Sequence, residues 1–136
     1  MIQHVTRDIL RSELERSAAF YALLGFDPVP VPASLAGRGV WLERAGTQIH
    51  LLFVDDPAAA GRRPPGHVGI VVADYKQTVE RLGDAGHHVE PRREHWGSPR
   101  SYVRDPAGYL VELIAWAPGE RRPEAQQSRS AGEAGE

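Results

Sequence analysis

The stretches AGTQIHLL (residues 45–52) and AGYLVELI (residues 107–114) follow one pattern and decide the fold. Each begins with an Ala-Gly turn signal and continues as an apolar run typical of a buried strand. Each run is interrupted at the same position by an ionisable residue, His50 in the first stretch and Glu112 in the second. A buried ionisable group requires a hydrogen bond, a charged partner or a metal ion. His50 and Glu112 are therefore the first candidates for a functional site.

The repeat extends beyond these two strands. The segments QHVTRDI (residues 3–9) and GHVGIVV (residues 66–72) open equivalent halves of the chain. In each half the next segment has apolar residues at helical spacing and ends at a glycine, Gly25 or Gly86. A capping box that begins at Ser12 predicts the start of the first helix. Three short extended runs complete each half, so both are predicted to have the order β-α-β-β-β.

The histidines that open the two halves are equivalent as well. His4 precedes His50 by 46 residues, and His67 precedes Glu112 by 45 residues. Four potential ligands therefore fall on two equivalent pairs of strands.

Side chains alternate between the two faces of a strand, so one face of each sheet is predicted to pack and the other to carry the chemistry. His50 and Glu112 lie on the second of these faces. The residues predicted to face the helix layer are Ile49, Leu51 and Phe53 in the first half and Val111, Leu113 and Ala115 in the second.

Composition limits the functions that the chain can have. It has 136 residues, of which 41% are hydrophobic, and a formal net charge of -2, so neither nucleic acid nor a membrane is an expected partner. No run of apolar residues is long enough to span a membrane, and the N-terminal segment lacks the apolar core of a signal peptide. The absence of cysteine excludes disulfides and thiol chemistry. The sequence predicts a soluble, cytoplasmic protein.

We expect one domain over residues 1–116, built of two modules. The first module covers about residues 1–55 and the second about residues 66–116, with a Pro- and Gly-rich linker over 56–65. Residues 117–136 are polar and lack apolar periodicity, which predicts a disordered tail.

The tandem halves, with LERSAAFYALLGF (residues 14–26) in the first helix and YVRDPAGYLVELI (residues 102–114) in the last hairpin, resemble the vicinal oxygen chelate superfamily. That superfamily includes glyoxalase I, fosfomycin-resistance proteins, extradiol dioxygenases and bleomycin-resistance proteins. The resemblance covers roughly residues 2–116. It implies an α+β fold in which tandem βαβββ modules form a curved mixed sheet around a cavity, with the helices on the outer face.

The resemblance also implies a ligand set for a divalent metal ion. Carried over residue by residue, the ligand positions are His4, His50, His67 and Glu112. The segment from His4 to Gly25 is two residues longer than its counterpart, so Thr6 is an alternative to His4. Three imidazoles and a carboxylate suit zinc, nickel, iron, cobalt or manganese.

The family resemblance leaves several functions open. We expect a metal-dependent homodimeric enzyme with lyase, isomerase or transferase chemistry on a substrate with vicinal oxygens, in which Glu112 also serves as the base. Glyoxalase I has a glutamate where this chain has His50, which disfavours lactoylglutathione lyase activity. The alternatives are an oxygenase similar to the extradiol dioxygenases and a non-catalytic, antibiotic-binding resistance protein.

Three further residues are candidates for contact with a substrate. Tyr102 stands ten residues before Glu112, as a substrate-contacting tyrosine does in extradiol dioxygenases, although a purely structural role is the alternative. His95 and Trp96 lie in a predicted loop that could cover the mouth of a cavity or be an ordinary exposed loop. Asp105, by contrast, is interpreted only as a turn residue.

Overall fold

The computed structural model describes residues 1–56 and 66–120. Apart from Asp56, the predicted linker lies outside the described residues, as does the predicted tail from residue 121 on. The described chain divides into two compact units. The first contains the described residues up to His67 together with Arg104–Leu110, and the second contains Val68–Val103 and the described residues from Val111 on.

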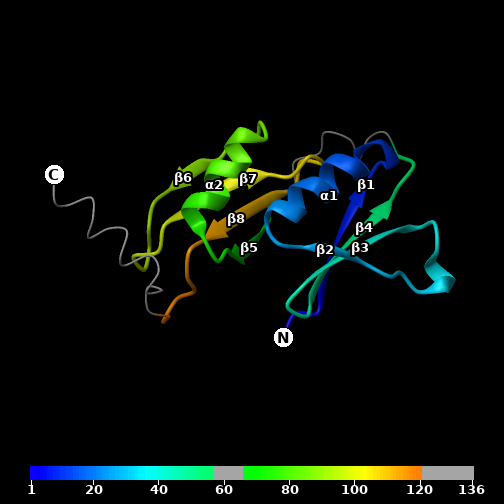
Figure 1. Ribbon diagram of the computed structural model, residues 1–136, viewed down its shortest axis with the longest axis horizontal. Helices are drawn as coiled ribbons and strands as arrows, with labels where there is room; N and C mark the ends of the chain where they lie inside the picture. Colours follow the sequence, from blue (N-terminus) through cyan, green and yellow to red (C-terminus); the bar gives the residue numbers. More distant parts are fainter. Residues whose placement is uncertain (57–65, 121–136) are drawn as a thin grey trace. The chain divides into compact units, whose positions relative to one another are not determined.

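Each half has the predicted βαβββ order (Figure 1). The first half consists of β1 (His4–Ile9), α1 (Leu14–Leu23), β2 (Asp27–Val29), β3 (Gly39–Arg44) and β4 (Thr47–Phe53), with short 3-10 turns η1 (Arg11–Glu13) and η2 (Ala33–Leu35). The second half consists of β5 (His67–Val71), α2 (Tyr75–Asp84), β6 (Glu90–Arg92), β7 (Arg100–Arg104) and β8 (Leu110–Ile114).

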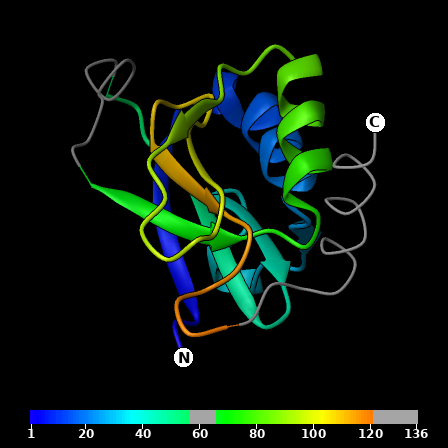
Figure 2. The same ribbon diagram turned by 90° about the vertical axis from the view of Figure 1, so that its left-hand side faces the viewer.

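The strands form two four-stranded sheets of the same design. Their strand orders are β1-β4-β3-β2 and β5-β8-β7-β6, so the last strand of each half lies next to its first strand. In the first sheet β1 runs parallel to β4, whereas β3 is antiparallel to both of its neighbours. The α+β class and the tandem modules predicted from the sequence are confirmed. In both views α1 lies beside the sheet of the first half and α2 lies beside the sheet of the second half (Figures 1 and 2).

The two helices end as predicted but begin in different ways. Gly25 and Gly86 follow α1 and α2 with positive φ angles of 88° and 91°, which glycine adopts without strain. Asp74 caps α2, since its side chain accepts a hydrogen bond from the backbone N–H of Gln77 at 3.1 Å. The capping box predicted at Ser12 is wrong. The chain first forms η1, and Glu13 accepts a hydrogen bond from the backbone N–H of Leu10 at 3.2 Å instead.

Burial follows the predicted alternation with one exception. Ile49 and Leu51 on β4 and their counterparts on β8 are buried, and each such side chain contributes roughly 2 kcal/mol of hydrophobic stabilisation. Phe53 is only half-buried, because β1 and β4 both end at its position. Its ring instead packs under the guanidinium of Arg11, with the Arg11 Cζ 4.3 Å from the ring centroid. None of the described helices is long and apolar enough to span a membrane.

A buried hydrogen bond ties Asp105 to α1 in the first unit. The predicted turn at Asp105 is confirmed, since its carboxylate accepts from the backbone N–H groups of Ala107 and Tyr109. It also accepts from the hydroxyl of Tyr21 at 2.6 Å, which the turn interpretation did not include. Burial raises the pKa of Asp105 above its ordinary value, and the bond from Tyr21 opposes this rise. Asp105 is therefore a buried acceptor as well as a turn residue.

Candidate functional site

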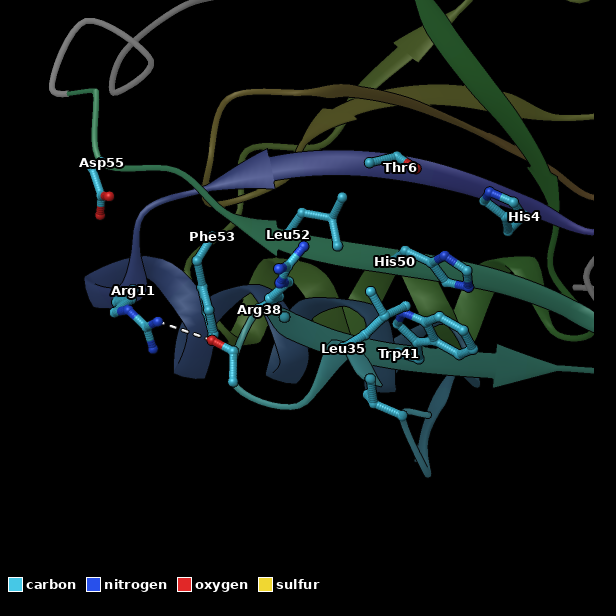
Figure 3. A pocket seen from close by; sticks show the side chains of 13 residues that line it. His4, Thr6, Arg11, Leu35, Arg38, Trp41, His50, Leu52, Phe53 and Asp55 are labelled. Atoms are coloured by element: carbon cyan, nitrogen blue, oxygen red, sulfur yellow. Dashed lines mark hydrogen bonds between the residues drawn. The ribbon is translucent and has the colours of Figure 1, made fainter. Parts of the chain in front are cut away.

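His50 lies between two aromatic rings on the face of the first sheet away from α1 (Figure 3). Trp41, directly opposite on β3, stacks on one side with ring centroids 4.0 Å apart. His4 stacks on the other side with ring centroids 4.2 Å apart. His50 is only 8% exposed. Burial, and then the neighbouring charge of His4, lowers the pKa of His50. The neutral imidazole, which can bind a metal, is therefore favoured.

A chain of polar groups orients this imidazole. The Nε2 atom of His50 lies 2.8 Å from the side-chain oxygen of Gln48, and the Gln48 amide N–H₂ donates to Glu43 at 3.0 Å. In the tautomer with a proton on Nε2, His50 donates to Gln48 and its Nδ1 keeps a lone pair. Such partners fix the direction in which a histidine presents its free nitrogen.

Thr6 and His4 both lie near His50 on β1. Thr6 is the direct partner of His50 in the parallel pairing, whereas His4 pairs with Gln48. The imidazole rings of His4 and His50 nevertheless stack on one another, which brings these two side chains together. Thr6 and His4 are both exposed, and both line the same cavity. Thr6 therefore remains an alternative to His4 as a ligand.

A cavity of about 490 Å³ lies on this face of the first sheet. Its volume is within the range of small-molecule sites, which is about 300–1,000 Å³. Besides the residues described above, the loops after β2 and β4 and the turn η1 contribute side chains to its lining (Figure 3). All of the lining residues belong to the first unit.

In the second unit, Glu112 forms an ion pair with Arg100. The Nε of Arg100 donates to Oε1 of Glu112 at 2.5 Å, and the two residues are 9% and 8% exposed. Arg100 also donates to the backbone oxygen of Arg93 at 2.8 Å and to the hydroxyl of Tyr102 at 3.1 Å. The bond to Glu112 raises the pKa of Arg100. Arg100 therefore faces Glu112 as a fixed cation.

Gly69 on β5 faces the second carboxylate oxygen of Glu112. A Cβ atom at Gly69 would lie 3.8 Å from Oε2 of Glu112 and 3.2 Å from the side chain of Ile114. The missing side chain therefore leaves room beside the carboxylate. His67 is exposed at the start of β5, the strand next to β8 in the sheet.

The structure thus brings His4 and His50 together on the first sheet, whereas His67 and Glu112 lie on neighbouring strands of the second sheet. Within residues 1–56 and 66–120, no group of three or more His, Asp or Glu side chains is arranged to hold a metal ion. The four-residue ligand set remains a prediction.

The other candidates lie in the second half. Tyr102 accepts a hydrogen bond from Arg100 and lies beneath the guanidinium of Arg92, with the Arg92 Cζ 5.1 Å from the ring centroid. His95 is exposed in the loop between β6 and β7. Trp96 in the same loop is partly buried, and its indole N–H donates to the backbone oxygen of Trp116 at 2.9 Å.

Comparison with protein families gives a match over most of the chain. The model of the Glyoxalase/Bleomycin resistance protein/Dioxygenase superfamily matches residues 1–113. The chain belongs to this superfamily. The predicted resemblance is therefore confirmed at the level of the family.

Known proteins that are similar to this chain carry different names. Glyoxylase I 4 of Arabidopsis thaliana is 26% identical over 121 residues, covering 82% of this chain and 68% of the relative. A Bacillus anthracis protein assigned to the glyoxalase family has a TM-score of 0.71 at 26% identity, covering 84% of this chain and 93% of its own. A variant of the Listeria monocytogenes fosfomycin resistance protein FosX, solved with Mn(II) and a dihydroxypropylphosphonic acid, has a TM-score of 0.67 at 18% identity, covering 87% and 94%. This last likeness shows the fold alone.

Sequence reasoning missed three residues of this superfamily member that position the candidate ligands. Trp41, Gln48 and Arg100 contact His50 or Glu112 directly. For Gln48 a signal was available, since a residue two positions from His50 on a strand shares its face. Trp41 and Arg100 lie on other strands, so their proximity depends on strand register.

Proposed function

We propose that this chain is a divalent-metal-dependent enzyme acting on a small substrate with two adjacent oxygens, by lyase, isomerase or transferase chemistry. One observation carries the proposal: His50 on β4 and Glu112 on β8 are buried at repeated positions, and each is oriented by a polar partner. Oriented, buried donors of this kind are typical of metal sites.

The chemistry of the donors suits a divalent ion. Metals bind the neutral imidazole, which burial favours at His50, and the carboxylate, which at Glu112 faces a fixed cation. Gly69 leaves room beside Oε2 of Glu112. We assign His4, His50, His67 and Glu112 as the residues that would hold the ion. A divalent ion is present in the FosX complex, which has the same fold.

The remaining roles fall to residues of the chain. A bound divalent ion supplies Lewis-acid stabilisation of negative charge on the substrate oxygens. Glu112 is the assigned general base, because it is the only carboxylate in the ligand set. Arg100 fixes the direction of Glu112 through Oε1, and Trp41 forms an aromatic wall of the cavity beside His50.

A passive binding protein is the second candidate. It is favoured by the aromatic lining of the cavity and by the lack, among the described residues, of three grouped ligands. One fold can host both enzymes and binding proteins, so the fold does not decide between these two candidates.

We further propose a cytoplasmic homodimer. A two-fold interface would give two equivalent sites, as is common for symmetric dimers. Sedimentation at micromolar concentration tests the dimer, and a monomer would contradict it. If sites draw ligands from both copies, mixing His4→Ala with Glu112→Ala chains restores part of the activity that each variant lacks.

An activity panel tests the proposed chemistry. Catechols, 2-oxo hemithioacetals, fosfomycin with thiols and bleomycin-like antibiotics are each incubated with protein and one of the five metals, in air and under nitrogen. We expect metal-dependent turnover that does not require oxygen. Catechol cleavage with oxygen uptake would instead support an oxygenase, and Tyr102→Phe would then reduce it. Tight antibiotic binding without metal or turnover would support the passive binding protein.

A further inference from the structure

The cavity on the first sheet has an uneven distribution of charge. Among the described residues that line it, Arg11 and Arg38 carry formal positive charges and Asp55 carries a formal negative charge. The side chains of all three are visible around the cavity in Figure 3. Their formal sum is one positive charge, which attracts an anion, while the repulsion from Asp55 grows with the negative charge of the ligand.

Arg11 is held in place before any ligand arrives. Its Nη2 atom donates to the backbone oxygen of Gly37 at 2.9 Å, and its guanidinium covers the ring of Phe53. These contacts use one N–H group and one face of the guanidinium. Guanidinium groups carry five N–H donors, so Arg11 retains donors for an anion.

Arg38 has a fixed backbone. Its N–H donates to the oxygen of Leu35 at 3.1 Å, and its own oxygen accepts from the N–H of Phe53 at 3.0 Å. Within the described part of the chain, its guanidinium forms no ion pair. An arginine anchored at its backbone and projecting into a cavity is suited to bind a carboxylate through two parallel hydrogen bonds.

The rest of the lining is largely apolar. Trp41 and Leu52 lie beside His50, and Leu35 and Phe53 extend this surface toward the arginines (Figure 3). Val31 also lines the cavity. Such a surface gains free energy by covering an apolar group of a ligand. The cavity therefore combines an apolar surface with a cationic region.

We propose that this cavity binds a small monocarboxylate with an aromatic or branched apolar body. The carboxylate lies at Arg38 and Arg11, and the apolar body covers Trp41 and Leu52. This inference rests on the proposed function in one respect, because it makes such acids the substrate class of the His4 and His50 site. The binding itself requires no metal.

Calorimetry on the intact chain in the presence of a chelator tests the proposal. The probes are 3-phenylpropionate, its neutral amide 3-phenylpropionamide, and 2-phenylethylphosphonate at mildly alkaline pH, where the phosphonate is a dianion. We expect the carboxylate to bind and the amide to bind at least about tenfold more weakly, because the amide loses the charge-assisted hydrogen bonds. The phosphonate is expected to bind no more tightly than the carboxylate.

Three variants make the test specific. Arg38→Gln should weaken carboxylate binding about tenfold, and Asp55→Asn should strengthen it about threefold by removing a repulsive charge. Arg16→Gln is the matched control, since Arg16 is exposed on α1 and does not line the cavity. It should leave the affinity unchanged.

Several results would overturn the inference: no binding of the carboxylate, equal binding of the amide, tighter binding of the dianion, or equal effects of Arg38→Gln and Arg16→Gln. The chelator separates this inference from the proposed function. If the chain binds the carboxylate in chelator but retains no divalent ion when it is loaded without chelator and desalted, the result would contradict the metal-dependent enzyme alone. Metal retention without carboxylate binding would contradict this inference alone.

Discussion

Arg100 and Glu112 form a buried ion pair in which Nε and Oε1 are 2.5 Å apart. Removing one member of such a pair leaves an uncompensated buried charge, whereas replacing both with apolar residues is often close to neutral. The pair therefore fixes the candidate base, but it need not add net stability.

Arg100→Met should lower the free energy of unfolding by about 3 kcal/mol, because it leaves the Glu112 carboxylate buried without its cation. The double variant Arg100→Met/Glu112→Met should recover most of this loss. Urea unfolding of the single and double variants measures the coupling. Arg92→Met is the control, since its pair with Glu90 is exposed and should contribute less than about 1 kcal/mol. Equal losses for Arg100→Met and Arg92→Met would contradict this account.

Gln48→Leu should weaken metal binding about tenfold, because it removes the acceptor that orients His50. Competition with a chromogenic chelator measures the change in affinity. Gln77→Leu, at an exposed position on α2, is the matched control. If both variants hold the ion equally well, Gln48 does not position a ligand.

In metal-free protein, NMR titration should give His50 a pKa below the ordinary 6.5. A lowered pKa means that His50 binds a proton more readily in the unfolded chain than in the folded chain. The contribution of neutral His50 to stability is therefore present above pH 6.5 and is lost as the pH falls through the folded-state pKa. Trp41→Leu exposes the imidazole and should raise its pKa. An unchanged pKa of His50 in this variant would show that the stacked Trp41 ring is not what buries the imidazole.

Tyr21→Phe should destabilise the fold by about 2 kcal/mol at neutral pH, because a buried carboxylate loses a donor. The Tyr21 bond lowers the pKa of Asp105, so its loss makes ionisation harder. The destabilisation should therefore grow as the pH rises from acid to neutral. Unfolding curves over this pH range measure it. Tyr109→Phe, which loses only exposed hydrogen bonds to the Asp8 backbone, should have a smaller effect with little pH dependence.

The repeat made much of the fold predictable from sequence. The matched spacing of His50 and Glu112 predicted β4 and β8, and alternation predicted which neighbours are buried. The helix ends at Gly25 and Gly86 were predictable because a positive φ favours glycine. These features depend on residues close together in the chain.

Contacts between distant segments could not be predicted in this way. The stacking of Trp41 on His50 depends on the register of β3 and β4, and the Tyr21 bond to Asp105 joins residues 84 positions apart. The predicted start of α1 was wrong because of a local competition between hydrogen bonds. The Ser12 pattern competes with a nearby alternative, in which Glu13 accepts from the N–H of Leu10.

Metal content per chain tests the central claim most directly. Purified protein is incubated with zinc, nickel, iron, cobalt or manganese in turn, desalted and examined by elemental analysis. We expect about one tightly held divalent ion per chain, and loss of most of it in His67→Ala and in Glu112→Ala. His88→Ala, which changes an exposed histidine after α2, should retain the ion. A wild-type chain that holds none of these metals would contradict the proposed metal-dependent enzyme.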